Sequence, residues 1–338
     1  MSASVLIYHP ESLRHVLAPG HVESPLRLKA ILAKFESLGL LHEVETPAAA
    51  SRADVRTTHS SSYVDLVETF GDGYLDADTP IHEETASLAL LAVGGALHAA
   101  LASARTGRPT LALVRPPGHH AGPDYGGGFC FYNNVAVAAH ALRARFPRVA
   151  ILDFDAHHGN GTSDIFAARR DVLYVSTHQF GIYPGTGPAG YAGDGPGEGY
   201  TVNIPFSAGA GDASFALAFR EVIEPVVRQF RPSAVLVSLG ADAHYRDPLT
   251  QLGLSSRGFA SVVEATLAIG RAVAHGRVSF VLEGGYDLPA LAEVCAGTYA
   301  QIRGESVPLQ YTEGRDEEGR GRQVVERVKK VHAAYWDL

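Results

Sequence analysis

Short runs of aliphatic residues alternate along this 338-residue chain with longer stretches of mixed apolar and polar character. Within five of these runs the apolar residues are consecutive rather than alternating, a pattern typical of strands that are buried on both faces. The predicted strands are Thr110 to Arg115, Val149 to Asp155, Val172 to Thr177, Ala234 to Gly240 and Val278 to Glu283.

The stretches between these runs carry apolar residues at helical spacing. We predict helices over Pro25 to Leu38, Glu83 to Ser103, Asn133 to Arg145, Ala213 to Gln229, Arg257 to Ala274 and Leu288 to Arg303. Strands that alternate with helices indicate βαβ crossovers. The pattern therefore predicts an α/β fold with three αβα layers around a mostly parallel central sheet.

The alternation runs from about residue 5 to residue 303, and no Ser-, Pro- or Gly-rich linker divides it into separately patterned halves. We therefore predict a single domain over residues 1–338 with its core at about 5–303. Near the C-terminus Val324, Val328, Val331 and Tyr335 share one helical face. This face predicts a last helix, at about 323–336, that packs back onto the body.

Composition restricts the possible functions. The chain has 28 Lys and Arg against 36 Asp and Glu, a formal charge of −8, and it lacks the basic block that nucleic-acid binding requires. Two cysteines fit a reducing compartment. The N-terminus has no signal-peptide pattern, and Gly, Ser or His interrupts the longest apolar stretches before a bilayer-spanning length. We expect a globular cytoplasmic protein that binds neither nucleic acid nor membrane; a homo-oligomer stays possible.

Ionisable side chains follow four of the predicted strands at their carboxyl ends, which is where parallel sheets bind ligands. Asp155 and His157 are two residues apart after one strand, so an extended backbone would point both side chains the same way. Asp242, after another strand, is the natural third ligand. Three ligands with an open position are typical of a catalytic divalent metal, and this oxygen-rich set suits Zn²⁺, Fe²⁺ or Co²⁺.

A tandem histidine pair follows a third strand. Asp153, behind the metal ligands, needs a cationic or hydrogen-bonding partner, and His119 is available for that role. Such a pair fixes the tautomer of the imidazole and raises its pKa, whereas His120 would face a metal-bound water. Tyr286 follows two glycines and could donate a hydrogen bond to an oxyanion.

Two glycine-rich loops complete the set of candidate features. The segment Gln179 to Tyr200 holds eight glycines and satisfies G-x-G-x-x-G, but it does not lead from a strand directly into a helix as a dinucleotide fingerprint would. We interpret it as a rim loop that shapes a pocket with Tyr183 and Phe180. The segment Gly126 to Gly128 is a similar loop, with Phe129 as a wall of the pocket.

Five segments carry a recognisable pattern: Arg115 to Ala121, Gly128 to Asn134, Asp153 to Thr162, Gly240 to Asp242 with Asp247 to Leu249, and Glu283 to Tyr286. Together they resemble the zinc-dependent histone deacetylase superfamily, which has the arginase-deacetylase fold, and the likeness runs in order over about residues 5–303. The chain is most similar to class II-like bacterial and archaeal members and to acetylpolyamine amidohydrolases, with Asn160 where class I enzymes carry Asp.

The resemblance implies roles for individual residues. Asp155, His157 and Asp242 would bind Zn²⁺, His119 and His120 would transfer protons, and Tyr286 would bind the substrate carbonyl. Asp153 and Asn160 would support the two histidines. A structural K⁺ ion is implied near Asp153, Asp155, His157, Ser176 and Thr177. The substrate-binding set is Phe129, Tyr183, Gly128, Gly284, Leu249 and the rim carboxylate Asp78, and Arg27 resembles the arginine behind the pocket floor.

The expected function is metal-dependent removal of acetyl groups from lysine side chains in proteins or peptides. An acetylpolyamine deacetylase is the first alternative, although polyamine-selective relatives carry Glu where this chain has Leu249. A dinuclear ureohydrolase would need Asp-x-His-x-Asp, but Gly159 stands at the last of those positions. A non-catalytic acyl-lysine binder would have no use for Tyr286 and the tandem histidines.

Overall fold

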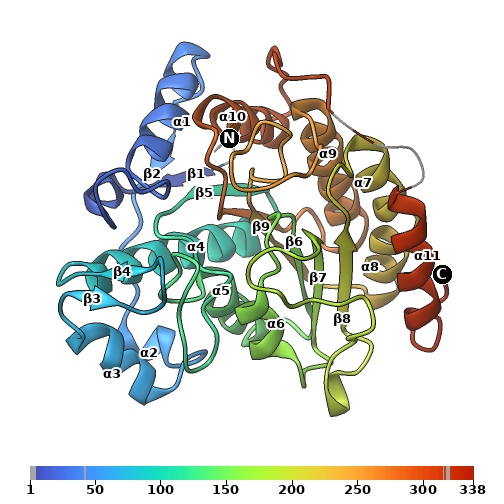
Figure 1. Cartoon of the computed structure of the whole chain (residues 1–338), viewed down its shortest axis with the longest axis horizontal. Coiled ribbons are helices and arrows are strands. Elements are labelled where there is room, and N and C mark those ends of the chain that lie inside the picture. The colour runs from blue at the N-terminus through green and yellow to red at the C-terminus, as the bar shows by residue number, and fades with distance from the viewer. Residues whose placement is uncertain (1–4, 42, 315, 317–319) are drawn as a thin grey trace.

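The central feature of the computed structural model is an eight-stranded sheet in which all neighbouring strands are parallel (Figure 1). The structure describes residues 5–41, 43–314, 316 and 320–338. Across the sheet the strands are β2 (Val44–Glu45), β1 (Val5–Tyr8), β5 (Thr110–Leu113), β10 (Val278–Leu282), β9 (Ala234–Leu239), β6 (Val149–Asp153), β7 (Val172–Gln179) and β8 (Thr201–Phe206). A separate antiparallel pair consists of β3 (Gly73–Tyr74) and β4 (Pro80–Ile81).

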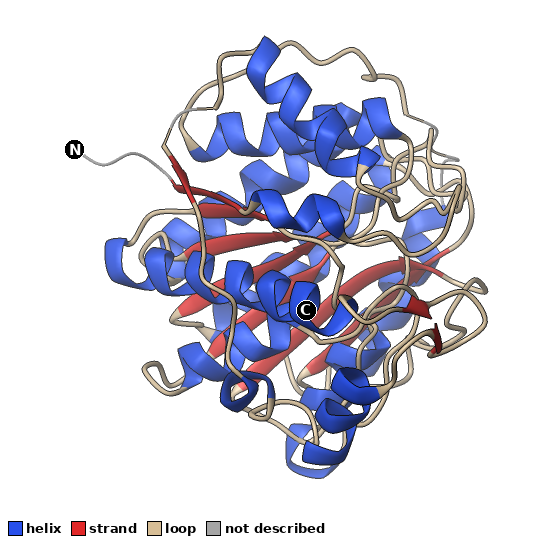
Figure 2. Cartoon of the chain, turned by 90° about the vertical axis from the view of Figure 1, so that its left-hand side faces the viewer, coloured by secondary structure: helices blue, strands red, loops and turns tan. Residues whose placement is uncertain are grey.

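Helices cover both faces of the sheet, which gives the predicted three layers (Figure 2). One face packs against α1 (Leu26–Ser37), α7 (Asp212–Ala218), α8 (Glu224–Phe230), α9 (Ser256–Val273), α10 (Leu288–Ile302) and α11 (Arg320–His332). The other face packs against α4 (Thr85–Thr106), α5 (Asn134–Arg143) and α6 (Asn160–Phe166). A third apolar cluster joins α4 and α5 to α2 (Arg52–Val55) and α3 (Ser61–Thr69).

Double-sided burial explains the continuous apolar runs. In β6, Ala150 and Leu152 belong to the core on the α1 side, whereas Val149 and Ile151 belong to the core on the α4 side. Because successive side chains of a strand point to opposite faces, apolar residues are favoured at consecutive positions of such a strand. The predicted strands therefore agree with the observed ones within a few residues.

The edge strand β8 was missed by the sequence analysis. It follows the glycine-rich loop directly, and it carries a proline, which sheets tolerate at their edges. Its apolar residues Val202, Ile204 and Phe206 alternate with Thr201, Asn203 and Pro205, and they face the core on the α1 side. The period-two pattern was a usable signal for this strand.

Two helical predictions need correction. The run predicted over Ala213 to Gln229 is divided into α7, a π-helical turn (Phe219–Ile223) and α8. The C-terminal helix spans Arg320 to His332 rather than about 323–336. Val328 is buried as predicted, but Val325 is buried in place of Val324, which is only partly buried. Neighbouring valines at 324 and 325 fit either face, so packing against α7 and β8 decided the register.

Helix α4 also departs from expectation. Its 22 residues are long and apolar enough to cross a membrane, although the sequence suggested that such stretches would be interrupted. In the structure 67% of its most apolar window is buried, against α5 and the neighbouring strands β1, β5 and β10. It is therefore the central helix of one layer of the fold. Residues 1–4, on which the absence of a signal peptide partly rests, lie outside the described residues.

Candidate active site

The candidate residues converge because four strands that precede them are neighbours. Strands β5, β10, β9 and β6 lie side by side, although β9 and β10 come much later in the chain than β5 and β6. His119 and His120 follow β5, Tyr286 follows β10, Asp242 follows β9, and Asp155 with His157 follows β6. Parallel strands place these carboxyl-terminal segments at one edge of the sheet.

The backbone that carries two of the predicted metal ligands is not extended, which corrects the sequence argument. Strand β6 ends at Asp153, and Asp155 and His157 lie in the bend beyond it. Backbone N–H groups orient the carboxylates instead: His157 N donates to Asp155 Oδ1 (2.9 Å), and Ala156 N donates to Asp242 Oδ1 (2.7 Å). Gly284 N donates to Asp155 Oδ2 (2.9 Å), so the segment after β10 takes part as well.

The three predicted ligands have the geometry of a metal site. Ligand atoms of Asp155, His157 and Asp242 lie within 4.8 Å of one another, and His157 Nδ1 is 3.1 Å from an oxygen of each carboxylate. Burial and the charge of Asp155 raise the pKa of Asp242 to about 6. Two buried like charges beside an imidazole nitrogen require a cation, so these residues fit a divalent metal ion.

Two glycines allow the carboxylates to sit this close to the backbone. A Cβ atom on Gly240 would lie 2.0 Å from Asp155 Oδ2, and one on Gly284 would lie 2.3 Å from Asp242 Oδ2. Both contacts are far shorter than a non-bonded contact allows. Gly240 and Gly284 are therefore required for the ligand geometry, which is a more specific role than the substrate contact expected of Gly284.

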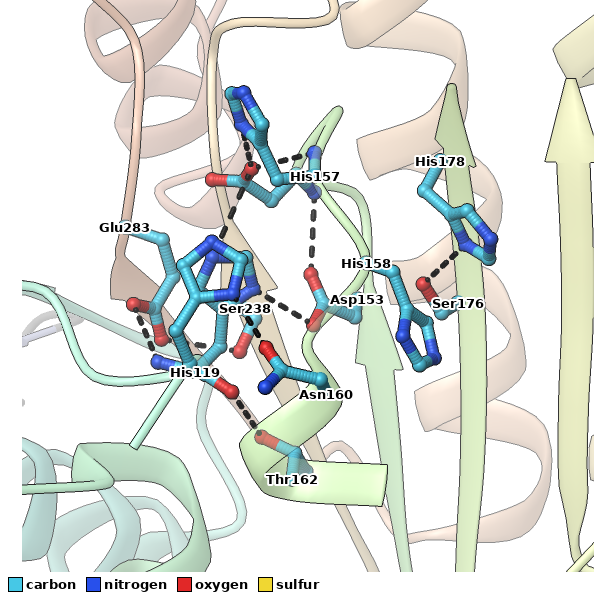
Figure 3. Close-up of polar contacts among 12 residues, drawn as sticks. His119, Asp153, His157, His158, Asn160, Thr162, Ser176, His178, Ser238 and Glu283 are labelled. Atoms are coloured by element: carbon cyan, nitrogen blue, oxygen red, sulfur yellow. Dashed lines mark hydrogen bonds and ion pairs between the residues drawn. The ribbon is translucent and has the colours of Figure 1, made fainter. Parts of the chain in front are cut away.

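Two carboxylates hold the ring of His119. Its Nδ1 is 3.1 Å from Asp153 Oδ2, as predicted (Figure 3). Its Nε2 is 3.7 Å from Asp155 Oδ1. Burial alone would lower the pKa of His119, but Asp155 and Asp153 outweigh it and raise this pKa to about 10. A dication at Asp155 opposes that rise.

Glu283 is a supporting residue to which the sequence analysis assigned no role. Its Oε2 accepts a hydrogen bond from Gly118 N (2.7 Å). The same oxygen accepts one from His119 N (3.2 Å), and Oε1 accepts one from Ser238 Oγ (3.1 Å) (Figure 3). The carboxylate thus fixes the backbone of the tandem histidines to the ends of β9 and β10. The sequence signal for this supporting role was the position of Glu283 directly before Gly284, in the segment Glu283 to Tyr286.

His120 has a neutral partner. Its Nδ1 lies 2.8 Å from Asn160 Oδ1, and its ring lies 4.0 Å from that of His119, centroid to centroid. Burial, followed by the neighbouring His119 and His157, holds the pKa of His120 well below its usual value. A neutral imidazole in this position has a free lone pair and suits a general base.

Tyr286 is positioned from both sides. Its backbone N donates to Asp247 Oδ2 (2.7 Å), and the guanidinium of Arg27 lies over its ring at 5.1 Å. Arg27 itself is fully buried and donates from Nε to the Gly285 carbonyl (2.8 Å), which places it behind the pocket floor as the resemblance implied. Burial raises the pKa of Tyr286, so its hydroxyl stays protonated and can donate a hydrogen bond.

A cavity of about 210 Å³ leads from the surface to these groups. It contains most of the predicted site residues and two further ones, Pro117 and Ile182. Its lining is Asp78, Pro117, His119, His120, Gly128, Phe129, Asp155, His157, Ile182, Tyr183, Leu249, Gly284 and Tyr286. The predicted Asp153, Asn160, Asp242, Ser176 and Thr177 lie outside that lining and support it from behind.

The mouth of the cavity carries a second carboxylate that the sequence analysis missed. Asp76 Oδ2 accepts a hydrogen bond from Gly128 N (2.9 Å) and one from Tyr183 Oη (3.4 Å). These contacts connect the two glycine-rich loops across the mouth, whereas Asp78 faces the cavity. Burial and the Asp76 charge raise the pKa of Asp78. The Asp-x-Asp spacing was the signal for this pair.

The rim loop between β7 and β8 contributes Tyr183 but not Phe180. Phe180 is 63% exposed and lines a different hollow beside α11, which corrects its predicted place in the pocket. Two buried histidines attach the loop to the sheet: His158 Nδ1 bonds Thr186 Oγ1 (2.8 Å), and His178 Nε2 bonds the Gly187 carbonyl (2.9 Å).

The residues assigned to K⁺ gather around the end of β6. Sheet register pairs Asp153 with Ser176 of β7, and Thr177 Oγ1 lies 3.4 Å from the Asp153 carbonyl. Ser176 and Thr177 are both buried. Within the described residues, the one group of His, Cys, Asp and Glu side chains with closely spaced ligand atoms is that of Asp155, His157 and Asp242.

Comparisons with known proteins show the family to which the chain belongs. A family model described as "Histone deacetylase domain" matches residues 21–302. The chain is 38% identical to a "Probable deacetylase" of Archaeoglobus fulgidus over 98% of both sequences. It is 37% identical to a "Histone deacetylase-like amidohydrolase" of Pseudomonas aeruginosa, over 80% of this chain and 73% of that protein. The solved structure "Crystal Structure of HDA15 HD domain" superposes with a TM-score of 0.90 at 33% identity, covering 99% of this chain and 96% of that one.

Proposed function

This chain belongs to the histone deacetylase family and is a hydrolase, and from that premise we propose that it removes acetyl groups from lysine side chains of proteins or peptides. The shape and lining of the cavity support this choice of substrate. Apolar walls from Phe129, Tyr183 and Leu249 surround a path that ends at the metal ligands and at Tyr286. A narrow apolar passage fits the methylene chain of lysine and delivers its terminal amide to the floor.

The floor supplies the groups that amide hydrolysis needs. Asp155, His157 and Asp242 would hold a divalent metal, which when bound supplies a Lewis acid that polarises the carbonyl and lowers the pKa of water from 15.7 to roughly 7. His120 accepts the proton of the attacking water and delivers a proton to the leaving amine. The Tyr286 hydroxyl donates to the carbonyl oxygen while negative charge develops there.

The other residues hold these catalytic groups in position. His119, paired with Asp153, places positive charge beside the reacting amide, and Glu283 holds the backbone of both histidines. Arg27 and Asp247 restrict the position of Tyr286. Pre-arranged donors of this kind act on developing charge without having to reorganise during the reaction.

We propose Zn²⁺ as the metal, with Fe²⁺ or Co²⁺ as substitutes that the same donors accept. We also propose a structural K⁺ at the end of β6, for which the pairing of Asp153 with Ser176 is the structural support. Reconstitution of metal-free protein with each divalent ion, followed by hydrolysis assays with and without K⁺, tests both assignments. An unchanged rate after removal of K⁺ would contradict a role for it.

The substrate is tested with a panel of acyl-lysine peptides and acetylated polyamines, assayed at equal concentration with Zn²⁺-loaded protein. We expect the acetyl-lysine peptide to have the highest kcat/KM. Leu249 lines the mouth where an acidic side chain would favour a polyamine. Failure to hydrolyse any acyl-lysine peptide would refute the proposal.

Deacetylation of an acetylpolyamine is the second candidate, and one feature favours it. Asp78 lines the cavity, and Asp76 lies directly beside it against Gly128 N, so two carboxylates are close to the path that a distal ammonium group of a polyamine would take. A Leu249→Glu variant should raise kcat/KM for the acetylpolyamine and lower it for the peptide, because it adds a third negative charge. A wild-type preference for the polyamine would make this second function the principal one.

We further propose that the protein acts in the cytoplasm. Both cysteines, Cys130 and Cys295, are buried and unpaired, as is usual in a reducing compartment. Fractionation of cells that produce the protein, with immunodetection of each fraction, tests this proposal. Recovery of the protein in a secreted or membrane fraction would contradict it.

A further inference from the structure

A chain of hydrogen bonds leads from His120 to the protein surface through a residue pair outside the cavity lining. Asn160 Oδ1 lies 2.8 Å from His120 Nδ1, and Asn160 Nδ2 donates to the hydroxyl of Tyr125 (3.0 Å). Tyr125 in turn donates to Asp164 Oδ2 (2.5 Å). Tyr125 is about one-third exposed, with 36% of its surface accessible, and Asp164 is exposed.

Local structure keeps these groups together. Asn160 and Asp164 are four residues apart on α6, so both side chains lie on one face of the helix. Tyr125 lies flat against Gly122, since a Cβ atom there would be 2.2 Å from its ring. His59 Nε2 accepts from Asn133 N, which leaves Nδ1 to donate to the Gly122 carbonyl (2.7 Å) and anchor the turn.

The direction of each hydrogen bond follows from the one before it. Tyr125 Oη is the donor to Asp164 Oδ2, so the hydroxyl hydrogen of Tyr125 points to that carboxylate. The Tyr125 oxygen is then an acceptor for Asn160, and the group that faces it must be the amide NH₂. The other end of the amide, Oδ1, therefore faces His120, whose Nδ1 must carry the hydrogen.

This series of hydrogen bonds determines which ring nitrogen of His120 carries the hydrogen and which carries the free lone pair. With the hydrogen on Nδ1, the lone pair lies on Nε2, and a general base in the cavity needs that lone pair. We propose that Tyr125 and Asp164 are positioning residues that set the tautomer of His120. The inference rests on the amide hydrolysis proposed above for its effect on rate, but the tautomer itself is a property of the free protein.

The need for such residues arises from Asn160. An aspartate at that position would accept from His120 Nδ1 whichever way its carboxylate turned. An asparagine that rotates by 180° instead presents its NH₂ group, which favours the tautomer with the hydrogen on Nε2. A partner that accepts from Nδ2 prevents the rotation, and Tyr125 is that partner.

The first test is a comparison of Tyr125→Phe with wild type, using Zn²⁺-loaded protein and an acetyl-lysine peptide. We expect kcat to fall about five- to tenfold, the effect of one lost hydrogen bond, with KM nearly unchanged. Asp164→Asn, which lets the residue donate as well as accept, should give a smaller fall. Tyr335→Phe is the matched control, because the similarly exposed Tyr335 hydroxyl also bonds a carboxylate, that of Glu198, and lies beyond the end of α11.

A double-mutant cycle separates positioning from simple packing. In an Asn160→Asp background the carboxylate fixes the tautomer without help, so adding Tyr125→Phe should change kcat by less than about twofold. The same fold loss in both backgrounds would mean that Tyr125 supports the structure only and would overturn the inference. Unchanged kcat in Tyr125→Phe alone would overturn it as well.

The second test observes the tautomer directly by ¹⁵N NMR of histidine-labelled, Zn²⁺-loaded protein, with His120 identified by its loss in His120→Ala. Wild type should show a protonated Nδ1, and Tyr125→Phe should move the shifts toward the other tautomer. Identical shifts in the two proteins would refute the inference. If wild type hydrolyses no acyl-lysine peptide, the proposed function fails, whereas the NMR result still decides the role of Tyr125.

Discussion

Replacement of Glu23 by glutamine should destabilise the protein strongly, because this carboxylate neutralises two buried cations. Arg115 Nη2 donates to Glu23 Oε2 (2.8 Å), and Arg115 Nε also bonds Oε1. Arg27 Nη1 donates to Oε1 (3.2 Å). All three side chains are 0% exposed, so water cannot take over the role of the carboxylate.

The expected loss of stability follows from the pKa of Glu23 and, separately, from the usual cost of breaking a buried ion pair. Burial alone would raise the pKa of Glu23, but Arg115, followed by His15 and Arg27, lowers it from 4.5 to about 2. At 1.36 kcal/mol per pKa unit this corresponds to about 3 kcal/mol of stability at neutral pH. Removing one partner of a buried pair typically costs about 3–5 kcal/mol. We therefore expect Glu23→Gln to lower the free energy of unfolding by about 3–5 kcal/mol.

Urea unfolding of the metal-loaded protein, followed by circular dichroism at pH 7, measures this difference. Glu11→Gln is the control, since the Glu11–Arg14 pair is half exposed and should be worth no more than about 1 kcal/mol. The folded-state pKa of Glu23 is depressed, so its contribution is complete above about pH 4.5 and is lost as the pH falls toward 2. The gap between wild type and Glu23→Gln should narrow in that window. Equal losses in the Glu23 and Glu11 variants would refute the reasoning.

Four further predictions concern the site. Tyr286→Phe should lower kcat by about 10²- to 10³-fold while a metal-chelating inhibitor still binds, because only the donor to the oxyanion is lost; full activity would remove Tyr286 from the reaction. Asn160→Asp should move the acidic limb of the pH–rate profile to higher pH, because an added negative charge raises the pKa of His120; superimposable profiles would contradict this. Gly284→Ala should weaken Zn²⁺ binding measured by calorimetry, since its Cβ would meet Asp242 Oδ2 at 2.3 Å; unchanged affinity would show that the backbone adapts. Removal of the metal by a chelator should abolish hydrolysis and lower the thermal unfolding temperature, with both restored by Zn²⁺, because paired carboxylates lose their counter-ion; a chelator-resistant rate would exclude a metal-dependent reaction.

Much of the site could be predicted from the sequence because its reactive side chains come directly after predicted strands. His119, Asp155, Asp242 and Tyr286 each follow a consecutive apolar run, and such runs end at the ligand-binding edge of a parallel sheet. The pairing of His119 with Asp153 was predicted from the cost of burying a carboxylate, and the structure has it at 3.1 Å.

Other parts depended on contacts between distant segments. The Asp76 carboxylate accepts a hydrogen bond from Gly128, 52 positions away, and the Glu283 carboxylate accepts one from Gly118, 165 positions away. No local sequence pattern predicts either hydrogen bond. The prediction for Phe180 failed because a loop residue next to a wall residue need not face the same hollow. The backbone at Asp155 was expected to be extended, although β6 ends at Asp153. The sequence gives only a weak signal for the residue at which a strand ends.

The sequence by itself determined the class of fold and the kinds of group at the site, because consecutive apolar runs and the residues that follow them are local properties of the chain. The tertiary structure decided which strands are neighbours, with β9 and β10 lying between β5 and β6, and hence that four separate segments meet at one point. It also decided the direction of the hydrogen bonds from Asp164 to His120. Donor and acceptor roles depend on which groups face each other in space, and a linear sequence does not state that.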